Sequence, residues 1–377
     1  MADDPSAILA LAFQRATESG NTPLIQDPKT HSQIELVARN TQNRACARFI
    51  LACALAKAYR PEVDIRKPYT EIGDADSFSG RTYDERYVLD FVIEHELPCN
   101  VTTAFLTPAF RNRNIVLTPE VNLVGRPPSV YMATLQLLDA VYDGRLSAED
   151  LLAESIRWLL VVRNERRERM RSLLAALRAT QGETVLSAEG IVSLVEQHLR
   201  LKRASRLPVL VVAAVYKVAQ EYLGERVLPL ESHTAADKQT GALGDLQITL
   251  VNDDQIVTSY EIKAKRVTSE DVDIAIGKIA NYGTRIDNYI FITTELIDQE
   301  VAEYAVSMYE KIGGIEVAVL DCIGFLRHFL HLFHRMRIQF LEAYQELVLA
   351  ESESAVSQPL KEVFLAMRQA AESGENF

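Results

Sequence analysis

Residues Gly241–Val267 read GALGDLQITLVNDDQIVTSYEIKAKRV. Two runs rich in β-branched and aromatic residues flank a short polar cluster, which is the pattern of an antiparallel β-hairpin. Because side chains alternate between the two faces of a strand, even positions are expected to face a core and odd positions to form one polar face. Asp245, Glu261 and Lys263 would then share that polar face. The apolar even positions are Leu246, Ile248, Leu250, Ile256, Tyr260 and Ile262.

The register of this hairpin determines how close the acidic residues come. A three-residue loop at 252–254 would pair Val251 with Gln255. In the same register Asp245 lies opposite Glu261, with Cβ atoms about 5 Å apart. A two-residue loop without a bulge would offset the two apolar patterns by one residue, so we expect the first register.

Two carboxylates at this separation repel each other unless a cation lies between them. Carboxylate oxygens with remaining positions open to water suit Mg²⁺. Lys263 follows Glu261 by two positions, and it could position an attacking water and offset charge on a phosphate. Lys265, on the same face, could contact phosphate or assist. The hairpin therefore predicts Mg²⁺-dependent hydrolysis of a phosphodiester.

The segments around the hairpin extend this interpretation. Gly244-Asp245, a spacer, and then Glu261-Ile262-Lys263 resemble the active-site pattern of the PD-(D/E)xK nucleases, although no proline precedes Asp245. A helix at 207–223, a second at 269–282 and a strand at 289–293 are expected, and this order is similar to the core of that family. The resemblance implies an α/β fold: a mixed-sheet PD-(D/E)xK nuclease core preceded by a mainly helical DNA-recognition region.

Many enzymes of that family carry one more acidic residue on the helix before the hairpin. Glu221, late in the helix expected at 207–223, is the candidate for this residue and could help to bind a second ion. Glu225 or Glu231 could serve instead, since a helix register cannot be fixed from one sequence.

Two segments of the N-terminal half combine cations with loop-forming residues. Cations and aromatic rings on loops suit contacts to phosphates and bases, and in the major groove Arg is the usual reader of guanine and Asn of adenine. The alternative interpretation is an ordinary surface loop. The candidate DNA-binding residues are Arg66, Lys67, Arg81, Arg111, Asn112, Arg113 and Asn114.

Three motifs in this half resemble the N-terminal half of the SacI-type restriction endonucleases. They are RKPYTEIG at 66–73, SGRTYDE at 79–85 and TPAFRNRN at 107–114. The resemblance implies a Type II restriction enzyme that cuts both strands of a short palindromic site in double-stranded DNA, as a homodimer. Two rivals stay open: a structure-specific or repair nuclease of the same fold, and a non-catalytic DNA-binding protein.

Length and composition are consistent with a protein of several domains. The 377 residues and 48% hydrophobic content predict two or three domains with real cores. We expect a recognition region at 1–205, a nuclease core at 206–335 and C-terminal helices at 336–377 that pack on the core or on a dimer partner. No apolar run approaches the ~20 residues of a membrane span, and the N-terminus is acidic, so a cytoplasmic protein is expected. The net charge of −12 argues against indiscriminate coating of nucleic acid.

Several further patterns are expected to be structural. Continuous helices are expected at 33–59, 187–206 and 322–349. Four scattered cysteines without a CxxC motif indicate core thiols rather than a zinc site or disulfides. His328, His331 and His334 recur every three residues. At this spacing successive side chains point in different directions around a helix, and no cluster of acidic residues accompanies them, so we expect no metal site there.

Overall fold

The computed structural model describes residues 4–41, 43–111, 114–180, 186–230 and 243–373. The chain divides into two compact units, Met1–Glu168 and Arg169–Phe377. The division falls inside the long helix α7 (Ala148–Thr180), whereas the sequence suggested a boundary near residue 205. The helices expected to form a separate C-terminal segment lie in the second unit.

The first unit is helical and is built around α3 (Ala45–Tyr59). Every residue of α3 from Ala45 to Ala56 is buried, as expected for a helix that is apolar on all sides. Its thiols Cys46 and Cys53 are free and buried, so the prediction of core cysteines is confirmed for them. The other elements of this unit are α1 (Pro5–Ser19), α2 (Pro28–Arg39), η1 (Thr70–Ile72), α4 (Gly80–Tyr83), η2 (Asp84–Val88), α5 (Leu89–Glu94), η3 (Ala104–Leu106) and α6 (Pro128–Tyr142).

The single helix predicted for 33–59 is wrong, because α2 and α3 are separate. Asn40 has extended backbone angles and ends α2. Its side chain accepts a hydrogen bond from the amide of Asn43, whose own side chain accepts from the amide of Ala45. Side chains of this type compete with the helical hydrogen-bond ladder, and here they end one helix and start the next.

The second unit contains a five-stranded mixed sheet in the order β1-β2-β3-β4-β5. The first three strands are antiparallel, and β3, β4 and β5 are parallel. Helices α11 and α12 provide the two parallel crossovers. The short β1 was not predicted. The strands are β1 (Glu225–Val227), β2 (Leu246–Leu250), β3 (Ile256–Lys263), β4 (Asn288–Thr293) and β5 (Glu316–Asp321).

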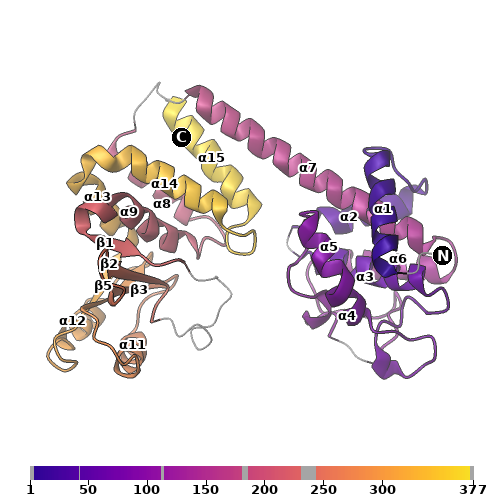
Figure 1. The fold of residues 1–377 in the computed structure, drawn as a ribbon, viewed down its shortest axis with the longest axis horizontal. Coiled ribbons are helices and arrows are strands. Elements are labelled where there is room, and N and C mark those ends of the chain that lie inside the picture. The colour runs from indigo at the N-terminus through magenta and orange to yellow at the C-terminus, as the bar shows by residue number, and fades with distance from the viewer. Residues whose placement is uncertain (1–3, 42, 112–113, 181–185, 231–242, 374–377) are drawn as a thin grey trace. The chain divides into compact units, whose positions relative to one another are not determined.

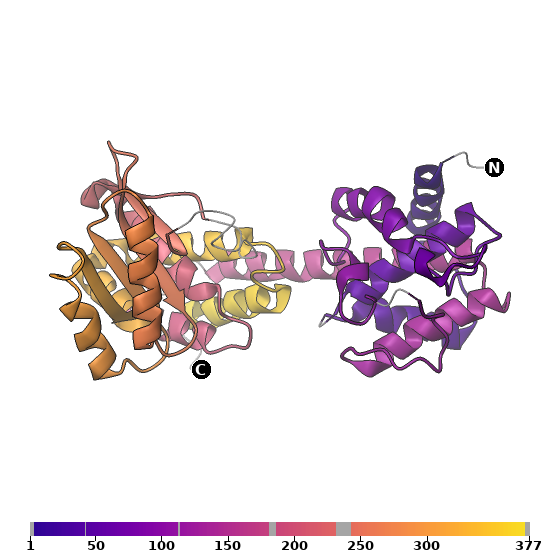
Figure 2. The ribbon, with the colours of Figure 1, turned by 90° about the horizontal axis from the view of Figure 1, so that it is seen from below.

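Helices cover both faces of this sheet (Figures 1 and 2). One face carries Leu246, Ile248 and Tyr260 and belongs to a core that includes residues of α8, α9, α13, α14 and α15. The other carries Tyr289 and Phe291 and packs against α11 and α12. A sheet with parallel strands is normally buried on both sides. The helices are α8 (Ala188–Leu199), α9 (Leu207–Leu223), α11 (Ser269–Asn281), α12 (Gln299–Ser307), α13 (Cys322–Leu332), α14 (Arg337–Ala350) and α15 (Gln358–Ser373), with the short η4 (His334–Met336).

The hairpin follows the predicted register at one end only. Leu246 pairs with Tyr260, as predicted, and the pairing continues regularly to Ile248. A β-bulge then shifts the pairing by one residue, so the predicted three-residue loop and the Val251–Gln255 pair are wrong. Because a bulge reverses the faces beyond it, Ile256 joins the core under α11 instead of the core under α9.

Two other predicted helices are also interrupted. The helix expected at 187–206 ends at Leu199, and Arg203 has a left-handed backbone conformation with φ of 65°. The helix expected at 322–349 breaks at Phe333, whose ψ of 50° is not helical. This break lets α13 pack on α8 and α14 pack on α9. None of the helices in the described part of the chain has the length and apolar composition of a membrane span.

Candidate active site

The predicted acidic residues meet where β2 begins. Asp245 directly precedes β2, and continuation of the Leu246–Tyr260 pairing places it opposite Glu261, as predicted. Its Oδ2 accepts a hydrogen bond of 2.7 Å from the amide of Ile262. A Cβ on Gly244 would lie 2.6 Å from the carbonyl oxygen of Tyr260. Glycine therefore allows the chain to approach β3 closely enough to bring Asp245 to this position.

The carboxylate of Glu261 lies among three side-chain donors. Its carboxylate accepts contacts of 2.6 Å from Lys263 Nζ at Oε1 and of 2.9 Å from Lys278 Nζ at Oε2. The hydroxyl of Tyr289 also donates to Oε2. Burial raises the pKa of Glu261, but these three donors outweigh burial and lower the pKa below its usual value. Glu261 is therefore ionised at neutral pH.

Lys263 lies between two carboxylates. Besides Glu261, it contacts Asp271 Oδ1 at 3.2 Å. Burial lowers the pKa of Lys263, but the two carboxylates outweigh burial and raise it. In this arrangement Lys263 is a protonated donor, suited to orienting a water or a phosphate rather than to accepting a proton.

Asp271 connects the cluster to α11. It forms a capping box with Thr268 at the start of that helix, which fixes the helix end beside Lys263. Lys265 lies at the solvent edge of the cluster: its side chain is 72% exposed, and its Nζ lies 3.8 Å from Asp271 Oδ1. Lys265 is thus free to reach a ligand in solvent, as its predicted role requires.

Three residues of the cluster, Asp271, Lys278 and Tyr289, were not among the site residues predicted from the sequence. Lys278 lies seven positions after Asp271 on α11, so both project from one side of the helix, and that spacing could have indicated it. Tyr289 reaches Glu261 because β4 runs parallel to β3, with Ser259 paired to Tyr289. No local pattern in the sequence gives that register.

The structure does not bring Glu221 to the acidic pair. Glu221 lines a groove between α9 and α14, among Lys217, Val218, Gln220, Gln339, Glu342, Ala343 and Glu346. Helix α9, which carries Glu221, covers the face of the sheet that carries Tyr260. Tyr289, which contacts Glu261, lies on the opposite face, under α11. Glu225 is paired with Leu250 at the other end of β2, and Glu231 lies outside the described residues.

The donor set is chemically suitable for Mg²⁺. Asp245 and Glu261 provide hard oxygen ligands, and Asp245 is exposed to solvent, which would leave coordination positions for water. Within the described residues, no group of three or more His, Cys, Asp or Glu side chains is arranged to hold a metal ion. A cation at Asp245 and Glu261 would therefore have two protein carboxylates and would have to displace a donor from Glu261.

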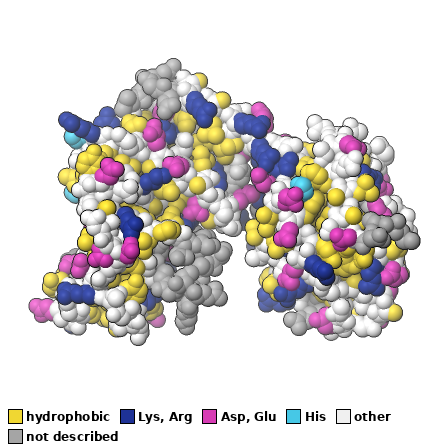
Figure 3. Space-filling view, viewed as in Figure 1, with side chains coloured by type: hydrophobic (Ala, Val, Ile, Leu, Met, Phe, Trp, Pro, Cys, Tyr) yellow, Lys and Arg dark blue, Asp and Glu magenta, His cyan; other side chains and the backbone are white. Residues whose placement is uncertain are grey.

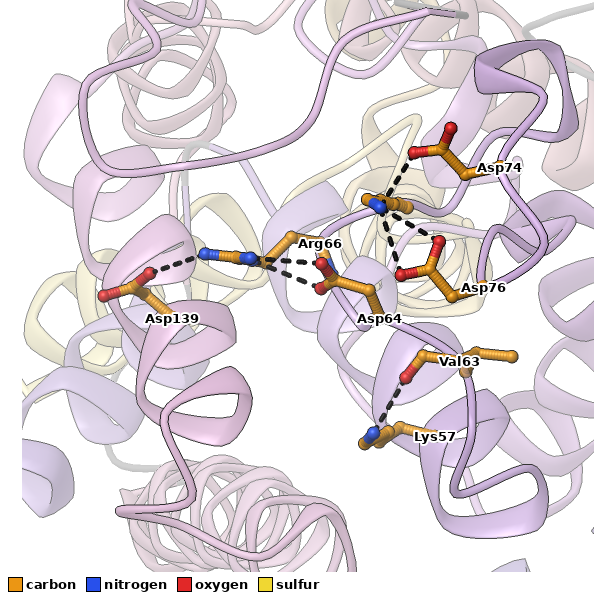
Figure 4. A network of polar contacts seen from close by, with 8 residues as sticks. Lys57, Val63, Asp64, Arg66, Asp74, Asp76 and Asp139 are labelled. Carbon is orange, nitrogen blue, oxygen red and sulfur yellow. Dashed lines mark hydrogen bonds and ion pairs between the residues drawn. The ribbon is translucent and has the colours of Figure 1, made fainter.

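The N-terminal candidates Arg66 and Lys67 are held by neighbouring carboxylates, and Figure 4 shows Arg66 between Asp64 and Asp139. Arg66 forms ion pairs with Asp64 and Asp139, and its guanidinium lies 3.1 Å from the centre of the Tyr142 ring. Lys67 binds two more carboxylates. These contacts favour the structural interpretation of both residues, which fix the loop. The carboxylate partners of Lys67 are Asp74 and Asp76, at 2.8 and 2.9 Å.

Three other N-terminal candidates, Arg81, Arg111 and Asn114, face solvent. Arg81 is 52% exposed and forms a surface pair with Glu85. Arg111 is exposed and donates to the carbonyl of Leu106, and Asn114 is also exposed. Asn112 and Arg113 lie outside the described residues. On the face seen in Figure 3, Lys and Arg side chains are interspersed with Asp and Glu side chains.

Comparison with known proteins identifies the domain that contains the cluster. Residues 184–295 match the family model described as the SacI restriction endonuclease C-terminal domain. The matched segment includes Asp245, Glu261, Lys263, Lys278 and Tyr289. A comparison with curated proteins finds no match. The resemblance to the SacI-type restriction endonucleases is thereby confirmed for this segment, which is similar to the C-terminal domain of such an enzyme.

Proposed function

We propose that this chain, of which residues 184–295 match the SacI restriction endonuclease C-terminal domain, is a Type II restriction endonuclease that hydrolyses a phosphodiester in each strand of double-stranded DNA at a specific site. The proposal is supported mainly by one observation: Asp245 and Glu261 lie opposite each other, with Lys263 beside them, inside the matched segment. Paired acidic oxygens next to a protonated lysine are the groups that phosphodiester hydrolysis needs.

Asp245 and Glu261 would hold Mg²⁺ in this proposal, as in the PD-(D/E)xK nucleases that the hairpin resembles. When bound, Mg²⁺ would polarise the phosphate and make a water molecule more acidic. Lys263 would orient that water and stabilise charge on the phosphate through its ammonium group. Lys265 would contact a neighbouring phosphate. In-line attack would break the bond to the 3′ oxygen and leave a 3′ hydroxyl.

Recognition of the DNA sequence is assigned to the N-terminal region. Arg81, Arg111 and Asn114 are exposed and carry groups that read base edges or bind phosphates. Asn112 and Arg113, in the same motif, remain candidates. Arg66 and Lys67 would support the loop instead of contacting DNA. A homodimer would present two such sites to a palindrome, one to each strand.

The experiment that tests the proposal is digestion of a long, unmethylated and fully sequenced DNA duplex with Mg²⁺. The wild-type protein should give discrete bands, and mapping of the fragment ends would reveal the target. Glu261→Gln and an EDTA lane should leave the DNA intact. Glu270→Gln alters an exposed residue in the first turn of α11 and serves as the matched control, which should cut normally.

The other outcomes identify the rivals. A smear without discrete bands would indicate a structure-specific or repair nuclease. If the wild-type protein leaves several DNA substrates intact, the catalytic assignment is wrong, and the interpretation as a non-catalytic DNA-binding protein remains. Cleavage by Glu261→Gln at the wild-type rate would show that the chemistry lies elsewhere in the chain.

A further inference from the structure

Lys278 contacts Glu261 of the acidic pair but is not part of the trio of Asp245, Glu261 and Lys263. It comes from α11, and its Nζ lies 2.9 Å from Glu261 Oε2. Lys263 holds the other oxygen, Oε1, at 2.6 Å. The two oxygens of Glu261 are thus divided between two lysines that come from different elements.

An ammonium group and a divalent cation cannot share one carboxylate oxygen without strong repulsion. Two like charges a few ångströms apart in a partly buried site repel much more than they do in water. The third partner, Tyr289, is neutral and fully buried, so it can keep its contact when a cation binds. Lys278 is 23% exposed, and its flexible side chain can turn toward solvent.

We propose that Lys278 is a positioning residue that holds Glu261 when the site contains no cation and releases Oε2 when a divalent cation binds. The inference rests on the proposed function, because it takes Asp245 and Glu261 as the cation ligands. It implies that Lys278 weakens cation binding and thereby sets the concentration of Mg²⁺ at which the site is filled. Lys263, on the other oxygen, remains in place to act on the substrate.

The test measures the binding of Mn²⁺, as a spectroscopic substitute for Mg²⁺, to the full-length protein without DNA. Electron paramagnetic resonance of free Mn²⁺ gives the dissociation constant for each variant. Lys278→Met should bind Mn²⁺ about tenfold more tightly, because one positive charge beside the cation is removed. Lys278→Arg keeps the charge and should bind with nearly wild-type affinity. Lys311→Met removes an exposed lysine after α12 and controls for net charge.

Several results would overturn the inference. Equal or weaker Mn²⁺ binding by Lys278→Met would do so, provided that its circular dichroism spectrum matches the wild type. So would tighter binding by Lys278→Arg to the same extent as by Lys278→Met. If no variant binds Mn²⁺, the inference also falls.

The same measurements separate this inference from the proposed function. Glu261→Gln should lose Mn²⁺ binding. If this variant binds Mn²⁺ with wild-type affinity, Glu261 is not a cation ligand, and both proposals are overturned. If the wild type cuts DNA with Mg²⁺ and Glu261→Gln does not, the proposed function stands. Unchanged Mn²⁺ affinity in Lys278→Met would then overturn the role of Lys278 alone.

Discussion

Gly244 determines how closely the chain before β2 approaches β3. A Cβ at this position would lie 2.6 Å from both the carbonyl oxygen of Tyr260 and the hydroxyl of Ser259. The chain would have to move away, and Asp245 would move with it. We predict that Gly244→Ala lowers the free energy of unfolding by about 1–3 kcal/mol and reduces cleavage at least about tenfold, because a small misplacement of a reacting group is enough to do so.

The matched control for this substitution is Gly277→Ala. Gly277 lies within α11, and a Cβ there would meet nothing within 4 Å. This variant should raise the free energy of unfolding by about 0.5–1 kcal/mol and cut DNA normally. Urea denaturation and a cleavage assay measure both effects. Equal stability of the two variants would contradict the packing argument at Gly244.

Glu261 should make stability depend on pH. Burial raises its pKa, but Lys263, Tyr289 and Lys278 together lower it below the ordinary value of 4.5. The folded protein thus binds this proton less readily than the unfolded chain does. The resulting stabilisation is complete above pH 4.5 and is lost as the pH falls through the lowered pKa.

The variant Glu261→Gln isolates this contribution. At neutral pH it should be less stable than the wild type, because Lys263 and Lys278 lose their charged partner. The difference in unfolding free energy should shrink as the pH falls below 4.5, where the wild-type carboxyl also becomes neutral. Urea denaturation of both proteins over a pH series measures it. A difference that stays constant, or grows toward acid, would rule out a lowered pKa.

At the scale of elements, the hairpin shows what one sequence can predict. Alternation of apolar and polar residues is local information, and it puts Asp245 and Glu261 on one face. Their opposition depends on the register, which follows the prediction only at the Leu246–Tyr260 end. The bulge near Val257 reverses the faces, and it was missed because Ile256 is apolar and fits either core. Lys278 and Tyr289 depend on the α11 crossover and on the parallel register of β4, which are contacts between elements.

Arg48 connects α3 to two other segments of the first unit. It is fully buried, and it donates 2.6 Å hydrogen bonds to Asp84 of η2 and to the carbonyl of Asn100. We predict that Arg48→Met lowers the free energy of unfolding by about 3–5 kcal/mol, because the Asp84 carboxylate would stay buried without its charged partner. Denaturation followed by circular dichroism measures this loss.

The control for Arg48 is an exposed arginine next to the same helix. Arg60 follows α3 and pairs with Glu62 on the surface. Arg60→Met should change stability by less than about 1 kcal/mol, as is usual for surface ion pairs. Similar losses of unfolding free energy in the two variants would show that the burial of the Arg48–Asp84 pair does not determine its contribution to stability.

At the scale of the whole chain, the division into two units could not be predicted from sequence patterns. The boundary falls within the continuous helix α7, where apolar periodicity and charge run on without a break. Composition changes more visibly near residue 205, where a cationic segment ends and the apolar α9 begins. A domain is defined by which residues pack together, and here those contacts are distant in sequence.

Each unit has its own hydrophobic core, and this predicts two unfolding transitions. Arg48 contributes to the core region of the first unit and Gly244 to the sheet of the second. Arg48→Met should therefore lower the temperature of one calorimetric transition and leave the other near its wild-type position, whereas Gly244→Ala should do the reverse. Separate cores lose their packing separately unless contacts between them dominate stability. A single transition that both variants shift equally would show that the chain unfolds as one cooperative body.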